Sequence, residues 1–560
     1  MDTKVAIIGT GPTGIYTLKG LVASKVPLAI TIFEAESDPG KGTPYHPDIN
    51  DRAMLSNIAS IELPPICETL VEWLRRQSDT ELQRLGIERT AIQEREFYPR
   101  VVLGEYLQSQ FLQLVRLGQS RGQVIDIKAR HRVTDIALRQ DDIQISVQRP
   151  DDTSSTFGFD HVVMATGHDW PQNIEEKPGY YISPWPAPEL KRITNRSVGI
   201  LGTSLSGIDA LITVATANGA FYHDATGQIE YQPKPDSDDF HVTMMSRKGI
   251  LPEADFYCEV PYIAPIFCTT EAIDGLLATG RHDLLDDVFE LFRQELAASD
   301  PDYAASIGLS ALTVETLAPA YFAAREHSGP FSWAARNLAE AEQNKANRYT
   351  VQWRYAILRM HEVIARIIPQ LDNEDLKRFH KHFKTVFVDD YATVPHESIK
   401  RLLALHRAGK LDVMALGNDY QIDTDRVERG AAVAVEGKTL AYAAFIDATG
   451  QHSMSADDIP FPSLQEQGVV RKAQTVEAQS VFDEGLPDVT VETGGIELDD
   501  AFRPIFQHNL SNKLYCAAIS FLLHKLPFVQ GITSAEEIGT IVSKVIVDDV
   551  TASNRLQLIK

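Results

Sequence analysis

Residues 5–21 of the sequence are VAIIGTGPTGIYTLKGL, and LAITIFE follows at residues 28–34. Residues 5–8 are apolar and mostly β-branched, which predicts a short buried strand. A glycine-rich turn comes next, and residues 15–21 predict a helix. Residues 28–33 predict a second strand that ends on Glu34. A dinucleotide-binding βαβ unit requires this order of strand, glycine turn, helix, strand and acid.

The three glycines and the acid of this motif each have a physical role. Gly9 permits the tight turn, Gly11 lets a pyrophosphate approach the backbone, and Gly14 lets the helix pack on the strand. The helix N-terminus offers backbone N–H groups and a partial positive charge to the phosphates. Glu34 stands where a carboxylate accepts hydrogen bonds from a ribose diol.

Length and charge narrow the class of protein. The 560 residues predict more than one domain, and 44% hydrophobic residues are ordinary for a globular chain. A net charge of −24 argues against general affinity for nucleic acid or an anionic membrane. We find neither an N-terminal targeting signal nor an apolar run long enough to span a bilayer. We therefore expect a cytoplasmic protein with a small-molecule substrate, and the oligomeric state stays open.

The cysteines exclude one class of flavoenzyme. Cys67, Cys258, Cys268 and Cys516 lie far apart, and none forms Cys-x-x-Cys or a zinc-ligand spacing. Flavoprotein disulfide reductases need a redox-active pair near the flavin, which this sequence does not provide. The alternative is that Cys258 and Cys268 meet in space. We expect structural thiols in a reducing compartment and no metal site.

A second βαβ unit begins at residue 197. Residues 198–201 predict its strand, residues 208–217 its helix and residues 240–245 its returning strand. Ser204 replaces the middle glycine, and Ser246-Arg247-Lys248 follows the returning strand where an acid would stand in an NADH site. These groups would hold a 2′-phosphate by charge-assisted bonds, which favours NADPH over NADH. The alternative is that Arg247 and Lys248 are solvated turn charges.

The two fingerprints, with Ala-Thr-Gly strand ends at 165–167 and 448–450, outline the domain organisation. We expect an α/β protein with two Rossmann-like dinucleotide-binding domains, for FAD and NADP, and a helical insertion. Short strands over residues 123–148 predict a β-meander within the first domain. The expected boundaries are 1–190 for the first part of the FAD domain, 191–270 and 406–460 for the NADP domain, 271–405 for a helical cap, and 461–560 for a return to the FAD domain.

The expected cofactor contacts lie at both fingerprints and at nearby strand and helix ends. For FAD they are Gly9, Gly11, Pro12, Thr13, Gly14, Glu34, Ala35, Lys41, Gly42, Thr43, Ser56, Asn57, Arg100, Ala165, Thr166, Gly167, Gly531, Ile532 and Thr533. For NADP they are Gly202, Thr203, Ser204, Ser206, Gly207, Ser246, Arg247 and Lys248. His46 and His168 are candidates for positions near the flavin ring, but the sequence assigns no catalytic residue.

Several longer stretches resemble the YdhS family of bacterial FAD/NAD(P)-binding proteins. They are GPTGIYTL (11–18), SNIASIE (56–62), GTSLSG (202–207), GILPEADFYC (249–258), WRYAILR (353–359) and PFVQGIT (527–533). The resemblance implies two dinucleotide-binding folds with FAD and NAD(P) as cofactors, and it leaves the reaction open. More distant relatives sharing the FAD domain include flavin monooxygenases that oxidise an amino-acid nitrogen.

Three functions remain after these exclusions. The first is an NADPH-using flavin monooxygenase acting on a small polar or amino-acid-like substrate, in which the protein excludes water and places the substrate. The second is a flavin reductase or dehydrogenase that passes electrons to a quinone or a partner protein. The third is a non-enzymatic FAD/NADP sensor. In the first case the helical insertion would form the substrate cavity, with Trp353 and Arg354 as an apolar plate and a cation.

Overall fold

The computed structural model describes residues 2–168, 171, 173–450, 454–476, 490–506, 510–528 and 531–559. The chain divides into two compact units. Unit 1 contains the described residues within 1–46, 58–169 and 452–560, and unit 2 contains those within 47–57 and 170–451. Each unit has its own hydrophobic core.

Unit 1 is built on a five-stranded parallel sheet. Its strands, in spatial order, are β21 (Leu514–Cys516), β7 (His161–Met164), β1 (Thr3–Ile8), β2 (Leu28–Phe33) and β3 (Val124–Lys128). The register pairs Ile8 with both Phe33 and Met164, so three strands end together just before Gly9. This confirms the first predicted βαβ unit and brings its glycine turn to the carboxyl edge of the sheet.

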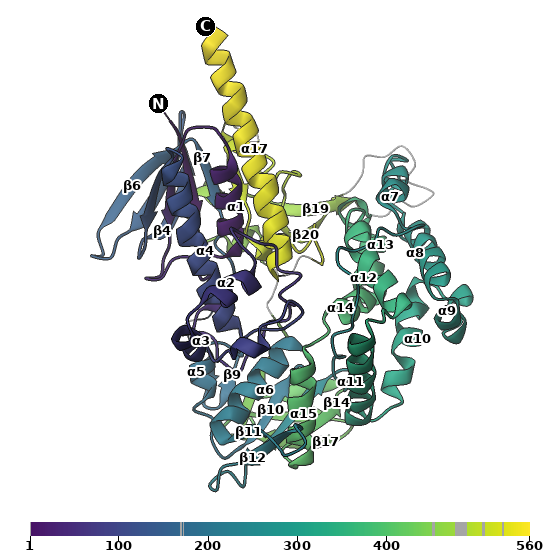
Figure 1. Ribbon diagram of the computed structural model, residues 1–560. Helices are drawn as coiled ribbons and strands as arrows, with labels where there is room; N and C mark the ends of the chain where they lie inside the picture. The colour runs from purple at the N-terminus through teal and green to yellow at the C-terminus, as the bar shows by residue number, and fades with distance from the viewer. Residues whose placement is uncertain are drawn as a thin grey trace. The chain divides into compact units, whose positions relative to one another are not determined.

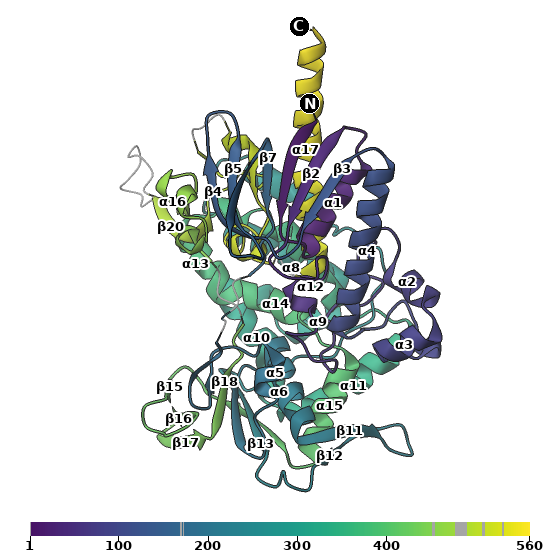
Figure 2. The same ribbon diagram turned by 90° about the vertical axis from the view of Figure 1, so that its left-hand side faces the viewer.

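Three helices accompany this sheet: α1 (Pro12–Ala23), α4 (Arg100–Ser120) and α17 (Gly531–Ile559). Helix α1 packs on both α4 and α17, and α4 also packs on β3. Figures 1 and 2 show the yellow helix α17 running beside α1. The two backbones approach closely because a Cβ added at Gly539 would lie 2.7 Å from the backbone nitrogen of Thr17. Small residues on facing helix surfaces therefore set this contact.

The start of α17 corrects one expectation. The sequence favours a turn over residues 528–535 and a helix over 535–545, whereas the helix begins at Gly531 and continues to Ile559. Buried apolar side chains recur at helical spacing through Ile532, Ala535, Ile538, Val542, Ile546 and Val550. This apolar stripe packs on α1 and stabilises the helix beyond the predicted range at both ends.

The rest of unit 1 is smaller elements. An antiparallel sheet contains β4 (Arg132–Leu138), β5 (Ile143–Gln148) and β6 (Ser154–Phe159). The predicted meander over 123–148 is therefore partly wrong, because its first strand, β3, joins the parallel sheet beside β2. The remaining elements are α2 (Leu70–Arg76), α3 (Asp79–Leu85), α16 (Pro462–Glu466), β19 (Lys472–Val476) and β20 (Thr490–Ile496).

Unit 2 contains the second βαβ unit. Its sheet has the order β14 (Leu411–Ala415), β13 (His241–Ser246), β10 (Ser197–Leu201), β18 (Ala444–Asp447), β9 (Tyr180–Tyr181) and β8 (Glu175–Lys177). The first five strands run parallel, and β8 pairs antiparallel with β9. The helices around it are α5 (Ala187–Leu190), α6 (Leu205–Asn218) and α15 (His396–Arg407).

Two antiparallel ribbons accompany this sheet. One contains β11 (Gly219–His223) and β12 (Ile229–Pro233), and the other contains β15 (Tyr420–Asp423), β16 (Ala431–Val435) and β17 (Lys438–Tyr442). The second ribbon packs Val433 and Tyr442 against Phe445 of β18 and lies beside that strand in Figure 2.

Helices fill the chain between β13 and α15. They are α7 (Thr270–Leu277), α8 (Leu285–Ser299), α9 (Pro301–Ser306), α10 (Val314–Glu326), α11 (Pro330–Asn347), α12 (Gln352–Ala365), α13 (Asn373–Arg378) and α14 (Lys384–Tyr391). A π-helical turn, Phe379–Phe383, joins α13 to α14. Phe292, Phe383 and Phe387 pack edge to face in the core of this layer. Within the described part of the chain, no helix has the length and apolarity needed to cross a membrane.

Candidate cofactor-binding sites

Two glycines of the first fingerprint are required by the fold itself. Gly9 has a φ of +99°, and a Cβ there would overlap the carbonyl oxygen of Ala165. A Cβ at Gly14 would overlap the carbonyl oxygen of Gly9. A larger residue at either position would push apart the turn, the helix and the neighbouring strand.

Gly11 differs because neither its backbone nor its packing requires glycine. Its φ of −71° and ψ of −178° suit any residue, and an added Cβ would meet only the Cα of Gly42, at 3.7 Å. Gly42 faces it with a φ of +77°, and a Cβ there would lie 3.0 Å from the Cα of Gly11. The two glycines thus leave backbone open to a ligand, which is the fit that a pyrophosphate needs.

The N-terminus of α1 suits the same ligand. Gly11 is the N-cap and Pro12 follows it, and among the described residues no side chain caps this end and no acid stands in its first turn. Backbone N–H groups of the first turn, including that of Thr13, are therefore available to an anion.

Glu34 is held in a fixed orientation at the end of β2. Its Oε2 accepts hydrogen bonds from the backbone N of Thr10 at 3.1 Å and from Thr10 Oγ1 at 2.5 Å. Its Oε1 accepts one from the backbone N of Glu36 at 3.0 Å. Thr10 in turn accepts a hydrogen bond from the backbone N of Gly40 at 2.8 Å. Thr10 was not among the residues predicted from the sequence, although a hydroxyl inside the glycine turn was a usable signal.

The predicted positively charged contacts lie in the loop after β2 and at the start of α4. Lys41 is only 8% exposed, and its Nζ lies 3.2 Å from Glu105 Oε1, so a cofactor phosphate would share this cation with a carboxylate. Arg100 begins α4 and lies close enough to Tyr45 to influence it. Burial raises the pKa of the Tyr45 phenol to about 12, against the opposing effect of Arg100.

The end of β7 reaches the same edge of the sheet. Ala165 donates a backbone hydrogen bond to Ile8 at 2.9 Å, and Gly167 accepts one from Ser520 Oγ at 3.1 Å. Thr166 lies between them and is exposed. Residues 165–167 therefore lie beside Gly9, because β1 and β7 are neighbouring parallel strands that end at the same edge of the sheet.

The other predicted FAD contacts are more scattered. Ala35 follows Glu34, and Thr43 begins a short 3₁₀ turn after Gly42. Gly531, Ile532 and Thr533 form the first turn of α17, where Ile532 is buried and Thr533 is exposed. Ser56 and Asn57, however, lie in the segment that belongs to unit 2, so the structure does not group them with the first fingerprint.

The second fingerprint keeps both packing glycines. A Cβ at Gly202 would lie 2.5 Å from the carbonyl oxygen of Ala448, and one at Gly207 would overlap the carbonyl oxygen of Gly202. Ser204 is the N-cap of α6 with a φ of −101°, and among the described residues no side chain caps this end. Its exposed side chain stands where Gly11 leaves backbone bare in unit 1. Ser206 lies in the first turn of α6.

The groups after β13 are not equivalent. Ser246 Oγ accepts hydrogen bonds from Thr203 Oγ1 and from the backbone N of Gly249, both at 3.1 Å. Lys248 forms an ion pair with Glu326, and its Nζ lies 4.4 Å above the centre of the Phe322 ring. Arg247 is exposed and forms no ion pair with any residue in the described ranges. Of the two predicted cations, Lys248 therefore already has an anionic partner.

The thiols, and the histidines that the structure describes, form neither a disulfide nor a metal cluster. All four cysteines are free, and burial raises the pKa of Cys67 and raises those of Cys268 and Cys516 to about 12. His46 Nε2 lies 4.0 Å from Asp38 Oδ2, and burial lowers the pKa of His168. The part of the chain that the structure describes contains no group of His, Cys, Asp or Glu able to hold a metal ion.

Comparisons with known families agree with the sequence motifs. The family described as "FAD-NAD(P)-binding" matches residues 6–169, and the "YdhS-like middle domain" matches residues 269–391. The uncharacterized protein YdhS of Escherichia coli (strain K12) is 40% identical over 552 residues, which cover 99% of each chain.

Similar solved structures are more distant. The ornithine hydroxylase PvdA of Pseudomonas aeruginosa matches 98% of this chain and 99% of its own, with 11% identity and a TM-score of 0.47. The bacillithiol disulfide reductase Bdr of Bacillus cereus matches 98% and 100%, with 12% identity and a TM-score of 0.41. These two proteins differ in activity, so such distant likeness assigns no reaction. The 40% identity to YdhS over nearly the full length of both chains shows the family. The chain belongs to the YdhS family and carries its FAD/NAD(P)-binding domain.

Proposed function

We propose that the protein is an FAD-dependent, NADPH-using monooxygenase of a small polar or amino-acid-like substrate. The observation that carries the proposal is a dinucleotide site of the flavoprotein type in a chain without a redox-active thiol pair. All four cysteines are free, and burial keeps Cys516, the one buried thiol of unit 1, protonated at neutral pH. Electrons from the flavin therefore have no protein disulfide to reduce.

Oxygen is the acceptor in this proposal. One atom of O₂ enters the substrate and the other leaves as water, and NADPH supplies two electrons and is oxidised to NADP⁺. Bound FAD supplies the capacity to take the hydride and to react with oxygen. The residues of this chain would bind and orient FAD through the open backbone at Gly11 and Gly42 and through the fixed carboxylate of Glu34.

NADPH is preferred to NADH in this proposal because no acid follows β13 and Arg247 is exposed there. We further propose that the helices within residues 271–405 supply the substrate-binding side chains. Arg354 does not act as the free cation expected from the sequence, because it is buried and paired with Glu253. An anionic substrate would have to displace that carboxylate.

The test is oxygen uptake by the FAD-loaded protein with NADPH and a panel of amines, amino acids and sulfides. We expect one class to accelerate both NADPH oxidation and oxygen uptake, with less hydrogen peroxide released per NADPH. Peroxide release that no substrate changes, together with fast reduction of a quinone, would instead indicate a reductase. Tight FAD binding without turnover would indicate a sensor.

A further inference from the structure

The helical layer of unit 2 contains a buried cluster of five charged side chains. Its members are Glu253, Arg325, Arg354, Asp389 and Asp390, from the loop after β13 and from α10, α12 and α14. The side chain of Asp389 is 15% exposed, and the other four are at most 8% exposed. Burial of so many charges is costly unless each is paired.

Four of the five are paired. Glu253 forms an ion pair with Arg354 and accepts a hydrogen bond from Trp333 Nε1 at 2.8 Å. Asp389 Oδ2 accepts hydrogen bonds from Arg325 Nη1 at 2.5 Å and from the Tyr321 hydroxyl at 2.9 Å. Arg325 also donates through Nη2 to the carbonyl oxygen of Leu251 at 2.7 Å.

Asp390 is the exception. It is 0% exposed, and neither of its carboxylate oxygens has a hydrogen-bond partner among the described residues. Two nearby donors, Nη1 of Arg354 and Nε of Arg325, also lack an acceptor there. An ionised carboxylate is costly to bury without a partner, so an additional partner is expected if Asp390 is to stay ionised.

Arg354 is not free to become that partner. Its guanidinium lies 4.4 Å from the centre of the Trp353 ring, and Trp353 stacks on Tyr303 with ring centres 4.2 Å apart. The stack and the ion pair with Glu253 fix the guanidinium from two directions.

The net charge of the cluster indicates the sign of the missing partner. Three carboxylates face two guanidinium groups, so the fully ionised cluster has one negative charge in excess. Burial raises the pKa of Asp390 and outweighs the lowering effect of the Arg354 charge. The negative charges of Asp389 and Glu253 raise this pKa further. A bound monocation would neutralise the cluster and keep Asp390 ionised.

The chemistry of the cluster favours an ammonium over a metal ion. In the described ranges no three acidic, histidine or cysteine side chains converge as metal ligands. A primary ammonium has three N–H donors, two of which could bond to the two vacant carboxylate oxygens of Asp390. The vacant N–H of Arg354 would suit an oxygen on the same molecule.

The backbone at this point also supports a binding role. The π-helical turn Phe379–Phe383 immediately precedes α14, which carries Asp389 and Asp390. One extra residue in a helical turn rotates everything after it by about 100°. Such turns occur often at functional sites, and this one sets which face of α14 holds the carboxylates.

We propose that Asp390 binds the primary ammonium group of a small organic cation inside the helical layer of unit 2. The proposal concerns binding, and only the identification of this amine with the oxygenated substrate rests on the proposed function. Binding is therefore measured without NADPH, so a failure of the flavin chemistry leaves it intact.

The experiment measures thermal unfolding and isothermal titration of the full chain with lysine, ornithine and butylamine. Butanol, tetramethylammonium and potassium chloride at equal ionic strength are the controls that lack N–H donors. Wild type should be stabilised by at least one primary amine and by none of the controls. Asp390→Asn should weaken this binding at least tenfold while leaving the melting temperature without amine equal or higher, because it removes an unpaired charge.

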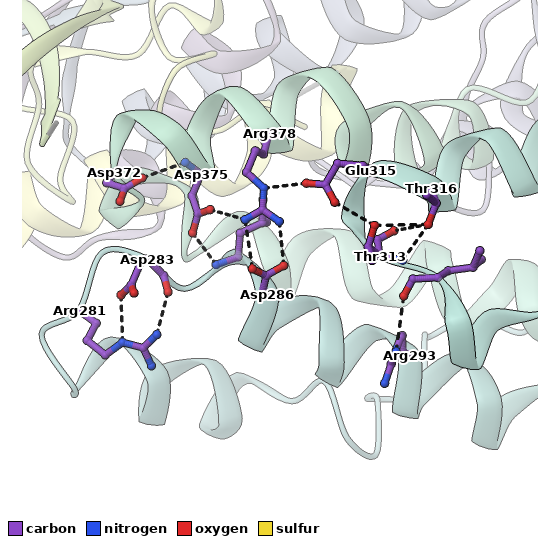
Figure 3. A network of polar contacts seen from close by, with 12 residues as sticks. Arg281, Asp283, Asp286, Arg293, Thr313, Glu315, Thr316, Asp372, Asp375 and Arg378 are labelled. Atoms are coloured by element: carbon purple, nitrogen blue, oxygen red, sulfur yellow. Dashed lines mark hydrogen bonds and ion pairs between the residues drawn. The ribbon is translucent and has the colours of Figure 1, made fainter. Parts of the chain in front are cut away.

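Asp286→Asn is the matched control, since Asp286 is an exposed carboxylate of the same layer that pairs with Arg378 (Figure 3). It should leave amine binding unchanged. The proposal is overturned if no primary amine stabilises wild type beyond the controls. It is also overturned if Asp390→Asn lowers the melting temperature and leaves amine binding intact, because Asp390 would then be a structural partner of Arg354. If Asp390→Asn does not fold, the wild-type comparison of amines with butanol decides alone.

Discussion

We expect glycine at position 11 to be needed for FAD binding but not for folding. Because its backbone is ordinary and its surroundings are open, Gly11→Val should fold with an unfolding free energy within about 1 kcal/mol of wild type. The same change should reduce bound FAD at least tenfold, since the side chain would occupy the approach of the pyrophosphate. Flavin released on denaturation and the melting temperature of the apoprotein measure the two effects.

Gly14→Ala is the control at the same turn. Its Cβ would overlap the carbonyl oxygen of Gly9, so this smaller change should destabilise the protein itself. A Gly11→Val protein that retains its full FAD content would show that the cofactor does not approach this backbone.

Arg247 and Lys248 are expected to contribute unequally to coenzyme choice. Arg247→Ala should weaken the preference for NADPH over NADH by about tenfold to a hundredfold, equivalent to the loss of a charge-assisted bond of about 1.5–3 kcal/mol. Lys248→Ala should change the preference little, because Lys248 is already paired with Glu326. Stopped-flow reduction of the flavin with both coenzymes measures the preference. Equal preference in Arg247→Ala and wild type would place the 2′-phosphate elsewhere.

Among the elements, the contact between α1 and α17 is sensitive to a single methyl group. Gly539→Ala should destabilise the protein by about 1–3 kcal/mol, because the added Cβ would lie 2.7 Å from the Thr17 backbone nitrogen. Gly275→Ala in α7 should do the opposite, by about 0.5–1 kcal/mol, because nothing lies within 4 Å of its added Cβ. Chemical denaturation compares the two variants. Equal stability of both would contradict the close packing of these helices.

Arg378 ties three helices together through carboxylates. Figure 3 shows it between Asp286 of α8, Glu315 of α10 and Asp375 of α13. Its hydrogen bond to Glu315 lowers the pKa of that carboxyl from 4.5 to about 2. Because the folded-state pKa is below the unfolded one, this stabilisation is complete above pH 4.5 and is lost as the pH falls toward 2.

Arg378→Gln should therefore be less stable than wild type at pH 7, and the difference should shrink between pH 5 and pH 2. The effect should be modest because Glu315 is 39% exposed. Unfolding at a series of pH values measures it. A difference that stays constant with pH would show that the Glu315 contact is not responsible.

The sequence predicted elements better than contacts between them. Both βαβ units could be predicted because apolar runs and glycine turns are local signals. The full length of α17 could not, because its stripe is recognisable only with α1 packed against it. The pairing of Lys248 with Glu326 and of Arg354 with Glu253 was equally invisible, since each pair joins residues 78 or more positions apart.

At the scale of the whole molecule, each dinucleotide fingerprint lies in its own compact unit. The units differ in one informative position, Gly11 in unit 1 and Ser204 in unit 2. Backbone bared by Gly11 suits a permanently bound cofactor, whereas the Ser204 side chain suits a coenzyme that exchanges. We therefore expect FAD to remain with the protein through gel filtration and NADP⁺ to dissociate. Retention of both nucleotides would contradict this difference.

The proposed monooxygenase function requires the flavin to deliver oxygen to an organic substrate. The most direct test is mass spectrometry of products formed by the FAD-loaded protein under ¹⁸O₂ with NADPH and the amine, amino-acid and sulfide panel. We expect one ¹⁸O atom in an organic product for each NADPH oxidised in a coupled turnover. NADPH oxidation that yields only labelled hydrogen peroxide, or that proceeds without oxygen when a quinone is supplied, would contradict it.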